Sequence, residues 1–343
     1  MRSRTRREVL GLTGLGATVA VSGCLGLFGT SASGHDSDSP ARIVPQRAGA
    51  LCQIDLEALL SAADLLVAAD TVLGAQSNAP NSVDDALAAL RETYGLDPRD
   101  VTWALGFVGE RASEQSPRDV VSAGYWGIVA ETDWNGDAAR SAFRNLAPEQ
   151  ATASTHDGVT VVSIGDEALA VLEEQRVVAG RKQAVEDTID AARGRSEGVT
   201  GRLRTAFDGA DGTYARFGAA LDMTALVTRV VGERLADALP VDSVQSVSGG
   251  LFDDEDERGL RVLVQLNSAT DAEQLSAQVD SFVGLVRAQG VGGAIQRYED
   301  AVQSLETATH GKTMTATYRA PIGEFNAVFG RLIAEMLRNV QTR

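Results

Sequence analysis

The sequence of 343 residues contains only two lysines, Lys182 and Lys312, although its basic residues number 31. Acidic residues number 47, so the formal net charge is −16. Binding to nucleic-acid phosphates needs an excess of cations, which this chain lacks. The same charge argues against electrostatic docking on an anionic membrane surface. We therefore expect no nucleic-acid partner.

Histidine and reactive motifs are equally sparse. The three histidines are too few for much metal or acid–base chemistry, and His156 and His310 lie in predicted hairpin turns, where a structural role is usual. The sequence contains no Gly-x-Ser-x-Gly, His-Glu-x-x-His, Cys-x-x-Cys or glycine-rich phosphate loop. We therefore expect no catalytic residue and no cofactor.

Aromatic residues make up 5% of the chain, whereas apolar residues as a whole make up 44%. Valine, leucine, isoleucine and alanine must therefore fill the core. The length allows one large domain or two ordinary ones. Abundant carboxylates and scarce lysine are typical of proteins that work in molar salt, where surface repulsion is screened. An ordinary acidic protein from an organism with a GC-rich genome is the alternative.

The N-terminus has the three parts of an export signal in order. A basic start contains the pair Arg6 and Arg7, followed by an apolar stretch over residues 10–23 that is too short to span a bilayer. The stretch ends in Val-Ser-Gly-Cys, so Cys24 stands where lipoproteins carry their lipidated cysteine. We therefore predict a twin-arginine signal peptide over 1–23, with Cys24 anchored in the bilayer.

Residues 24–47 are largely small and polar, and we predict a flexible tether there. If Cys24 is lipidated, Cys52 has no partner for an intramolecular disulfide. Cys52 lies in an apolar stretch, which indicates a buried thiol without catalytic function. We expect localisation on the outer face of the cytoplasmic membrane.

The remaining chain alternates strand and helix patterns. The predicted strands are 48–55, 100–109, 120–131, 157–164, 168–180, 213–222, 242–253, 258–267, 302–310 and 312–320. The predicted helices are 56–73, 83–94, 136–146, 182–193, 223–238, 271–289 and 322–340. Helices separated by strand pairs indicate an α+β fold of antiparallel sheets with helices packed on one face.

Similar element orders in the two halves suggest a duplicated architecture. We predict a first α+β unit over 48–198 and a second over 199–343. The alternative is that any α+β chain gives this impression when its pattern is interpreted coarsely. In either case, one face of an antiparallel sheet can remain open to a partner.

The most concentrated polar feature is a run of five carboxylates between two predicted strands. Such oxygens can bind Ca²⁺, although the spacing of a known calcium loop is absent. A solvated turn is the preferred interpretation, and a calcium site is the weaker candidate. The residues are Asp253, Asp254, Glu255, Asp256 and Glu257.

Together, the signal motif, composition and tether resemble uncharacterised twin-arginine-exported lipoproteins of haloarchaea. The specific part of this resemblance covers about 25 residues and implies no activity. We expect a membrane-anchored, non-catalytic binding or scaffold module whose partner is a surface protein or polymer. The alternatives are an extracellular hydrolase that uses carboxylates no motif marks, and a calcium-dependent surface module.

Overall fold

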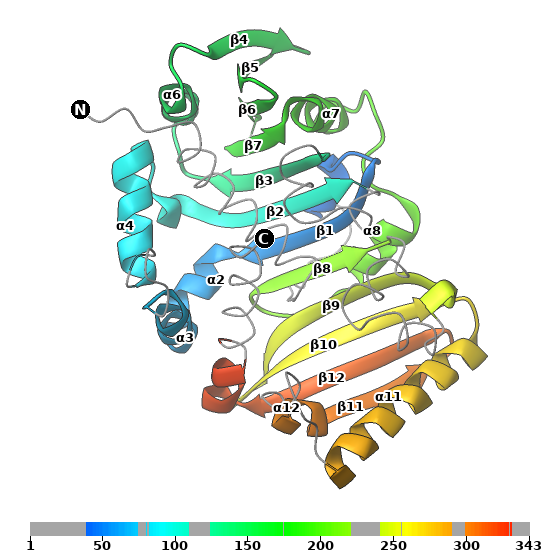
Figure 1. The fold of residues 1–343 in the computed structure, drawn as a ribbon. Coiled ribbons are helices and arrows are strands. Elements are labelled where there is room, and N and C mark those ends of the chain that lie inside the picture. Colours follow the sequence, from blue (N-terminus) through cyan, green and yellow to red (C-terminus); the bar gives the residue numbers. More distant parts are fainter. Residues whose placement is uncertain are drawn as a thin grey trace.

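Twelve strands of the described chain form one antiparallel sheet (Figure 1). The computed structural model describes residues 39–74, 80, 82–109, 124–173, 175–220, 241–254, 256–289, 299–328 and 330. The strands are β1 Ala48–Asp55, β2 Val101–Gly109, β3 Trp126–Thr132, β4 Ala151–His156, β5 Val159–Ile164, β6 Glu167–Val171, β7 Arg176–Arg181, β8 Ala215–Ala219, β9 Val244–Asp254, β10 Glu257–Leu266, β11 Leu305–His310 and β12 Thr313–Pro321. This confirms the predicted α+β class with antiparallel pairing.

Helical segments connect and cover these strands. They are η1 Pro40–Ile43, α2 Leu56–Ser61, α3 Ala63–Gly74, α4 Val83–Tyr94, η2 Pro98–Asp100, α6 Gly136–Leu146, α7 Lys182–Ala192, α8 Gly201–Asp208, η4 Val241–Ser243, α11 Ala269–Gln289 and α12 Glu299–Gln303, and residues 322–328 are also helical. The start and end of α4 agree with the prediction. Ser82 accepts a hydrogen bond from the Asp85 amide, and Gly95 ends the helix with a φ of 69°.

The strand order is β11-β12-β10-β9-β8-β1-β2-β3-β7-β6-β5-β4. At the centre β1 pairs with β8, and the antiparallel register runs from Ala50 opposite Ala219 to Ile54 opposite Ala215. This pair joins the two predicted units across their boundary at 198/199. The described strands of both halves therefore belong to one continuous sheet.

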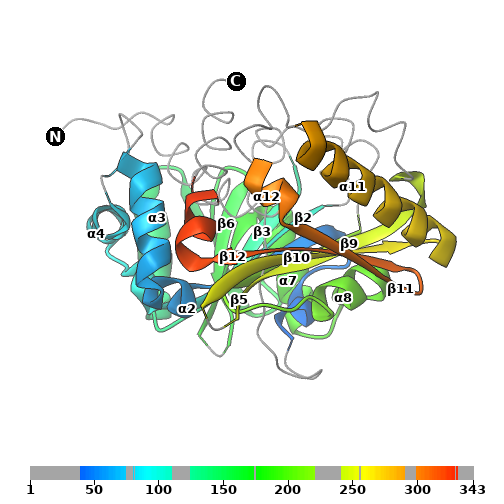
Figure 2. The same cartoon turned by 90° about the horizontal axis from the view of Figure 1, so that it is seen from below.

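Helices lie on both faces of the sheet, so the prediction of helices on one face is wrong (Figure 2). Successive residues of a strand point to opposite faces. On β7, Val178 belongs to a cluster with Val185 of α7, whereas Val177 packs with Ala139 of α6. Strand β7 therefore buries apolar side chains on both of its faces, and one helical layer cannot cover both.

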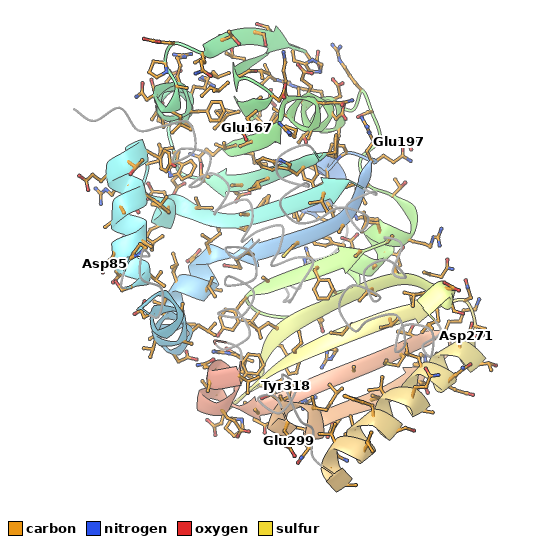
Figure 3. All side chains as sticks on the ribbon, viewed as in Figure 1. Asp85, Glu167, Glu197, Asp271, Glu299 and Tyr318 are labelled. Carbon is orange, nitrogen blue, oxygen red and sulfur yellow. The ribbon has the colours of Figure 1, made fainter. Side chains whose placement is uncertain are left out.

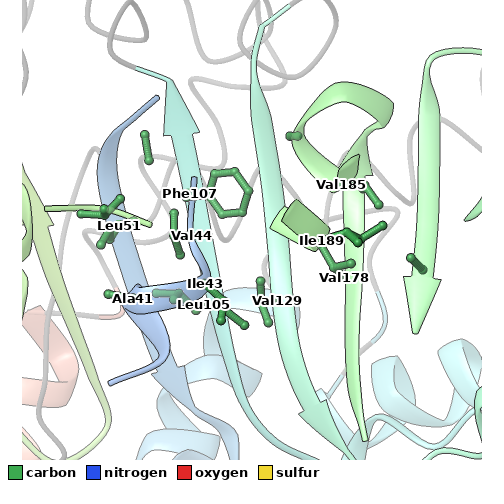
Figure 4. Packing of buried hydrophobic residues seen from close by; sticks show 14 of the residues in the cluster. Ala41, Ile43, Val44, Leu51, Leu105, Phe107, Val129, Val178, Val185 and Ile189 are labelled. Atoms are coloured by element: carbon green, nitrogen blue, oxygen red, sulfur yellow. The ribbon is translucent and has the colours of Figure 1, made fainter. Parts of the chain in front are cut away.

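The main core lies between the central strands and the helical layer formed by α7, α8 and η1 (Figure 4). Leu51, Leu105 and Val129 are fully buried there beside Ile189 of α7. Ala41 of η1 and Val44, which directly follows η1, contribute as well, since neither has exposed surface. The folded part thus begins by residue 39, whereas the predicted tether extended to 47.

Other parts of the chain also differ from the prediction. The strand expected over 168–180 is a hairpin, in which β6 and β7 are separated by a turn with Gln175 at a φ of 61°. Strand β4 and helix α8 were not predicted. Both are short, and β4 exposes its four central residues, so it has no apolar alternation to detect.

Candidate functional site

The acidic run predicted as a candidate cation site lies at the end of the β9–β10 hairpin, where Asp253 and Asp254 end β9 and Glu257 begins β10. Asp254 lies opposite Glu257 in the register of this hairpin. Glu255 lies outside the described residues. Asp254 forms an ion pair with Arg319 at 3.3 Å, and the backbone oxygen of Asp256 accepts a bond from the Ile322 amide. These contacts tie the turn to β12 and to the helix that follows it.

Asp253 takes part in a network around Arg258, a buried side chain with 1% exposure. The Arg258 Nε donates to Asp253 Oδ1 at 2.7 Å, and its Nη2 donates to the Tyr214 hydroxyl oxygen at 2.9 Å. Its Nη1 donates to Asp64 and, at 3.0 Å, to Asn326 Oδ1. We call these five residues the Arg258 cluster.

The Arg258 cluster connects four separate parts of the fold. Asp64 lies in the first turn of α3, Tyr214 directly precedes β8, and Asn326 belongs to helical residues 322–328. Asn326 Nδ2 also donates to Asp64 Oδ2 at 2.8 Å. The Tyr214 hydroxyl donates to Asp253, and the guanidinium lies 4.9 Å from the Tyr214 ring centre. The planar guanidinium fork suits such a network.

The electrostatics of the Arg258 cluster favour fixed charges. Burial alone would raise the pKa of Asp64, but hydrogen bonds from Asn326 and Arg258 outweigh it and lower that pKa. Burial opposes the charge of Arg258, yet Asp253 and Asp64 raise its pKa overall. Burial, with the bond to Asp253, raises the pKa of Tyr214 to about 12. These groups keep their protonation states near neutral pH and are suited to holding elements together.

Carboxylates elsewhere in the described chain are widely spread. Figure 3 shows Asp85 on α4, Glu167 on β6, Asp271 on α11 and Glu299 on α12, far apart on the ribbon. Within the described ranges, no three His, Cys, Asp or Glu side chains are grouped so that they could hold a metal ion.

The remaining titratable candidates from the sequence lie apart from the Arg258 cluster. The His156 Nε2 lies 2.9 Å from Asp190 Oδ1 on α7, and His310 is exposed at the end of β11. Cys52 is buried in β1, and this burial raises the pKa of its thiol to about 12. A thiol that stays protonated is a poor nucleophile.

The predicted export residues Arg6, Arg7 and Cys24 lie outside the described residues. None of the helices in the described ranges combines the length and apolar character needed to cross a bilayer. Sequence patterns located the acidic turn but missed Asp64, Tyr214, Arg258 and Asn326. The one local signal for this network was an arginine directly after the acidic run.

Comparison with known proteins gave structural similarities alone. No protein-family model and no curated protein matches the sequence. Three crystal forms of TP0453 have a related arrangement: form III has a TM-score of 0.48, 8% identity, and coverage of 86% of this chain and 99% of that one. Form I has a TM-score of 0.46, 9% identity, and coverage of 87% of this chain and 99% of that one. Form IV has a TM-score of 0.47, 8% identity, and coverage of 85% of this chain and 96% of that one. At these TM-scores the similarity carries no conclusion about what this chain does.

Proposed function

We propose that the protein is an extracytoplasmic lipoprotein whose folded body is a non-catalytic binding or scaffold module. One observation carries the proposal: the paired Arg6 and Arg7, a short apolar stretch and Cys24 occur in the order of a lipoprotein signal. The signal resembles those of uncharacterised haloarchaeal lipoproteins. The partner would be a surface protein or polymer, and not a nucleic acid.

The distance between anchor and body supports a role at the membrane surface. Cys24 is followed by a body that begins by residue 39. A fully extended chain spans at most about 3.5 Å per residue, so this connection reaches roughly 50 Å. The body would therefore work close to the lipid headgroups.

The polar contacts of the body support a scaffold more than a hydrolase. A glycosidase needs one carboxyl group whose pKa is raised beside another that stays ionised. Asp253 and Asp64 instead both form ion pairs with Arg258. Burial raises the pKa of Glu167, but this residue lies on β6, far from that pair. The same contacts weigh against calcium, since a cation at the turn would compete with Arg258 for Asp253 and with Arg319 for Asp254.

We also propose that the two halves descend from one duplicated unit. Outward from the centre, β1-β2-β3 corresponds to β8-β9-β10, and a helix follows the third strand in each half. The last strand of each returning meander, β7 or β12, then pairs with that third strand. The antiparallel β1–β8 pair would lie on the twofold axis relating the units.

Fractionation of cells that produce the full-length chain tests the anchor. Cys24→Ser should leave the membrane fraction or remain unprocessed, because no other residue can accept the lipid at that position. Cys52→Ala is the matched control and should remain membrane-bound. A membrane-bound, normally processed Cys24→Ser variant would exclude the lipid anchor.

The export route has its own test. Arg6→Lys combined with Arg7→Lys keeps the charge but removes the arginine pair, and the precursor should accumulate in the cytoplasm. Arg2→Lys with Arg4→Lys makes the same chemical change outside the pair and should be exported normally. If both double variants reach the membrane equally, the twin-arginine assignment fails.

A further inference from the structure

The two outermost strands of the sheet, β4 and β11, differ in how they are protected. An edge strand presents unpaired N–H and C=O groups, and proteins usually cover or charge such edges to prevent association. On β11, Thr307 bonds to Ser276 and Asp280 of α11, and Glu306 adds an exposed charge. This edge is guarded by a helix and by a carboxylate.

Strand β4 has neither protection. Its sequence, Ala-Thr-Ala-Ser-Thr-His, contains no Lys, Arg, Asp, Glu or Pro, and its register with β5 is continuous without a bulge. Residues 152–155 are exposed, and within the described chain no strand pairs with its outer side. In Figure 1, α6 and α7 lie inward of it. On a chain with a net charge of −16, this edge is neutral.

The β4–β5 turn determines which backbone groups face outwards. Asp157 and Gly158 both have positive φ, 46° and 77°, as in a two-residue type I′ turn. The closing pair of such a hairpin, here His156 opposite Val159, exchanges both of its hydrogen bonds. By alternation, the N–H and C=O groups of Ala151, Ala153 and Thr155 point away from β5. The Ala151 N–H is already bonded, because it donates to the Ala147 backbone oxygen at 3.0 Å.

We propose that β4 pairs antiparallel with β4 of a second copy of this chain, about a twofold axis at Ala153. In this register Ala153 lies opposite its own copy, Ala151 opposite Thr155, and Thr152 opposite Ser154. The N–H and C=O groups of Ala153 then meet those of the other copy, and the Thr155 N–H meets the Ala151 C=O of the opposite strand, because these residues lie at hydrogen-bonding positions of the new ladder. A twofold axis places the same patch on both partners and closes the assembly.

The side chains of β4 fit this occupant better than an unrelated peptide. All opposing residues are small, so two edges can approach to the usual strand spacing without a clash. Hydroxyl residues lie opposite each other at Thr152 and Ser154, and such cross-strand pairs stabilise sheets. Within β4, no charge faces a like charge across the axis. The two sheets would join into one, independently of the lipid anchor.

Sedimentation velocity of the full-length chain in mild detergent, over a concentration series, tests the proposal. The wild type should form dimers. Ala153→Lys places two ammonium groups opposite each other and should weaken dimerisation at least tenfold. Because that side chain is exposed in the monomer, circular dichroism should show an unchanged fold. Thr309→Lys makes the matched change on β11 and should dimerise like the wild type.

Mixing two variants with opposite charges at position 153 tests the proposed register. Ala153→Lys and Ala153→Glu should each be monomeric alone, and mixing them should restore a heterodimer, because opposite charges then face each other at the axis. A monomeric wild type at all concentrations would overturn the proposal. So would equal loss of dimers in Thr309→Lys, or failure of the mixture to associate.

Discussion

At the scale of single residues, Arg258 is the side chain on which the contacts among several separate elements depend. It is buried, and it holds Asp64 and Asp253 from two separate elements. Removing one partner of a buried ion pair costs more than the pair contributes, because the remaining charges lose their compensation. Both carboxylates retain some solvent contact, which moderates this cost.

We predict that Arg258→Met lowers the free energy of unfolding by about 3 kcal/mol. Urea denaturation measures this. Arg193→Met removes an exposed pair with Glu173 and should cost less than about 1 kcal/mol. Equal losses of unfolding free energy in the two variants would show that the buried contacts of Arg258 stabilise the fold no more than an exposed ion pair does.

Asp64 gives the Arg258 cluster a dependence on pH. Its pKa is lower in the folded chain than in the unfolded chain, so its contribution is complete above the unfolded value near 4 and is lost as pH falls through the folded value. We predict that Asp64→Asn is less stable than the wild type at pH 7 and that the difference shrinks below about pH 4. Thermal unfolding from pH 7 to 3 measures both chains, and a constant difference would contradict the prediction.

The sequence located the acidic turn but could not predict the Arg258 cluster. Arg258 lies 44 positions from Tyr214, 68 from Asn326 and 194 from Asp64. Local patterns identify a hairpin and its charges, but the choice of partners depends on how α3 and the last helix pack on the sheet. That packing follows from long-range contacts that no periodicity in one segment records.

At the scale of elements, the sequence predicted best those segments with a regular apolar pattern. Strand β10 and helices α4 and α7 follow their predicted ranges closely, because each has a regular apolar pattern. Strand β4 buries little and was missed. Helix α8 was missed because it is short and carries three charged residues among eight.

Helix α8 packs so closely on β8 that one glycine determines the contact. A Cβ atom on Gly218 would lie 2.8 Å from the Phe207 backbone nitrogen. We predict that Gly218→Ala costs about 1–3 kcal/mol, because either the helix or the strand must move. Chemical denaturation measures the loss.

Gly284 in α11 provides a control, because its substitution by alanine is expected to change stability in the opposite direction. A Cβ atom there meets nothing within 4 Å. Gly284→Ala should stabilise the protein by about 0.5–1 kcal/mol, since alanine restricts the unfolded chain and favours the helix. A neutral Gly218→Ala would mean that α8 does not pack on β8 as described.

At the scale of the whole molecule, the net charge of −16 opposes compactness. Native proteins have only about 5–15 kcal/mol of stability, so repulsion among surface carboxylates can outweigh it. We propose that the protein is adapted to molar salt, where the screening length is about 3 Å instead of about 30 Å at 10 mM.

We predict that the folded body expands or unfolds as KCl falls from molar to millimolar concentration, and circular dichroism over a KCl series measures this. Sucrose serves as the control, because it favours compact states by exclusion from the protein surface but does not screen charge. An unchanged spectrum and melting temperature at 10 mM salt would reject the adaptation, and the acidity would then point to a cationic partner.

The position of β1 beside β8 has a consequence for how the chain is made. Gln53 and Arg216, which bond across this pair, are 163 positions apart. A ribosome adding about 5–20 residues per second takes roughly 8–30 s to reach the second strand after the first. During that interval the edge of β1 that β8 will cover stays unpaired and can template aggregation, although β2 can already pair with the other edge. A message truncated between the halves would therefore yield an insoluble product, even though it encodes most of the main core.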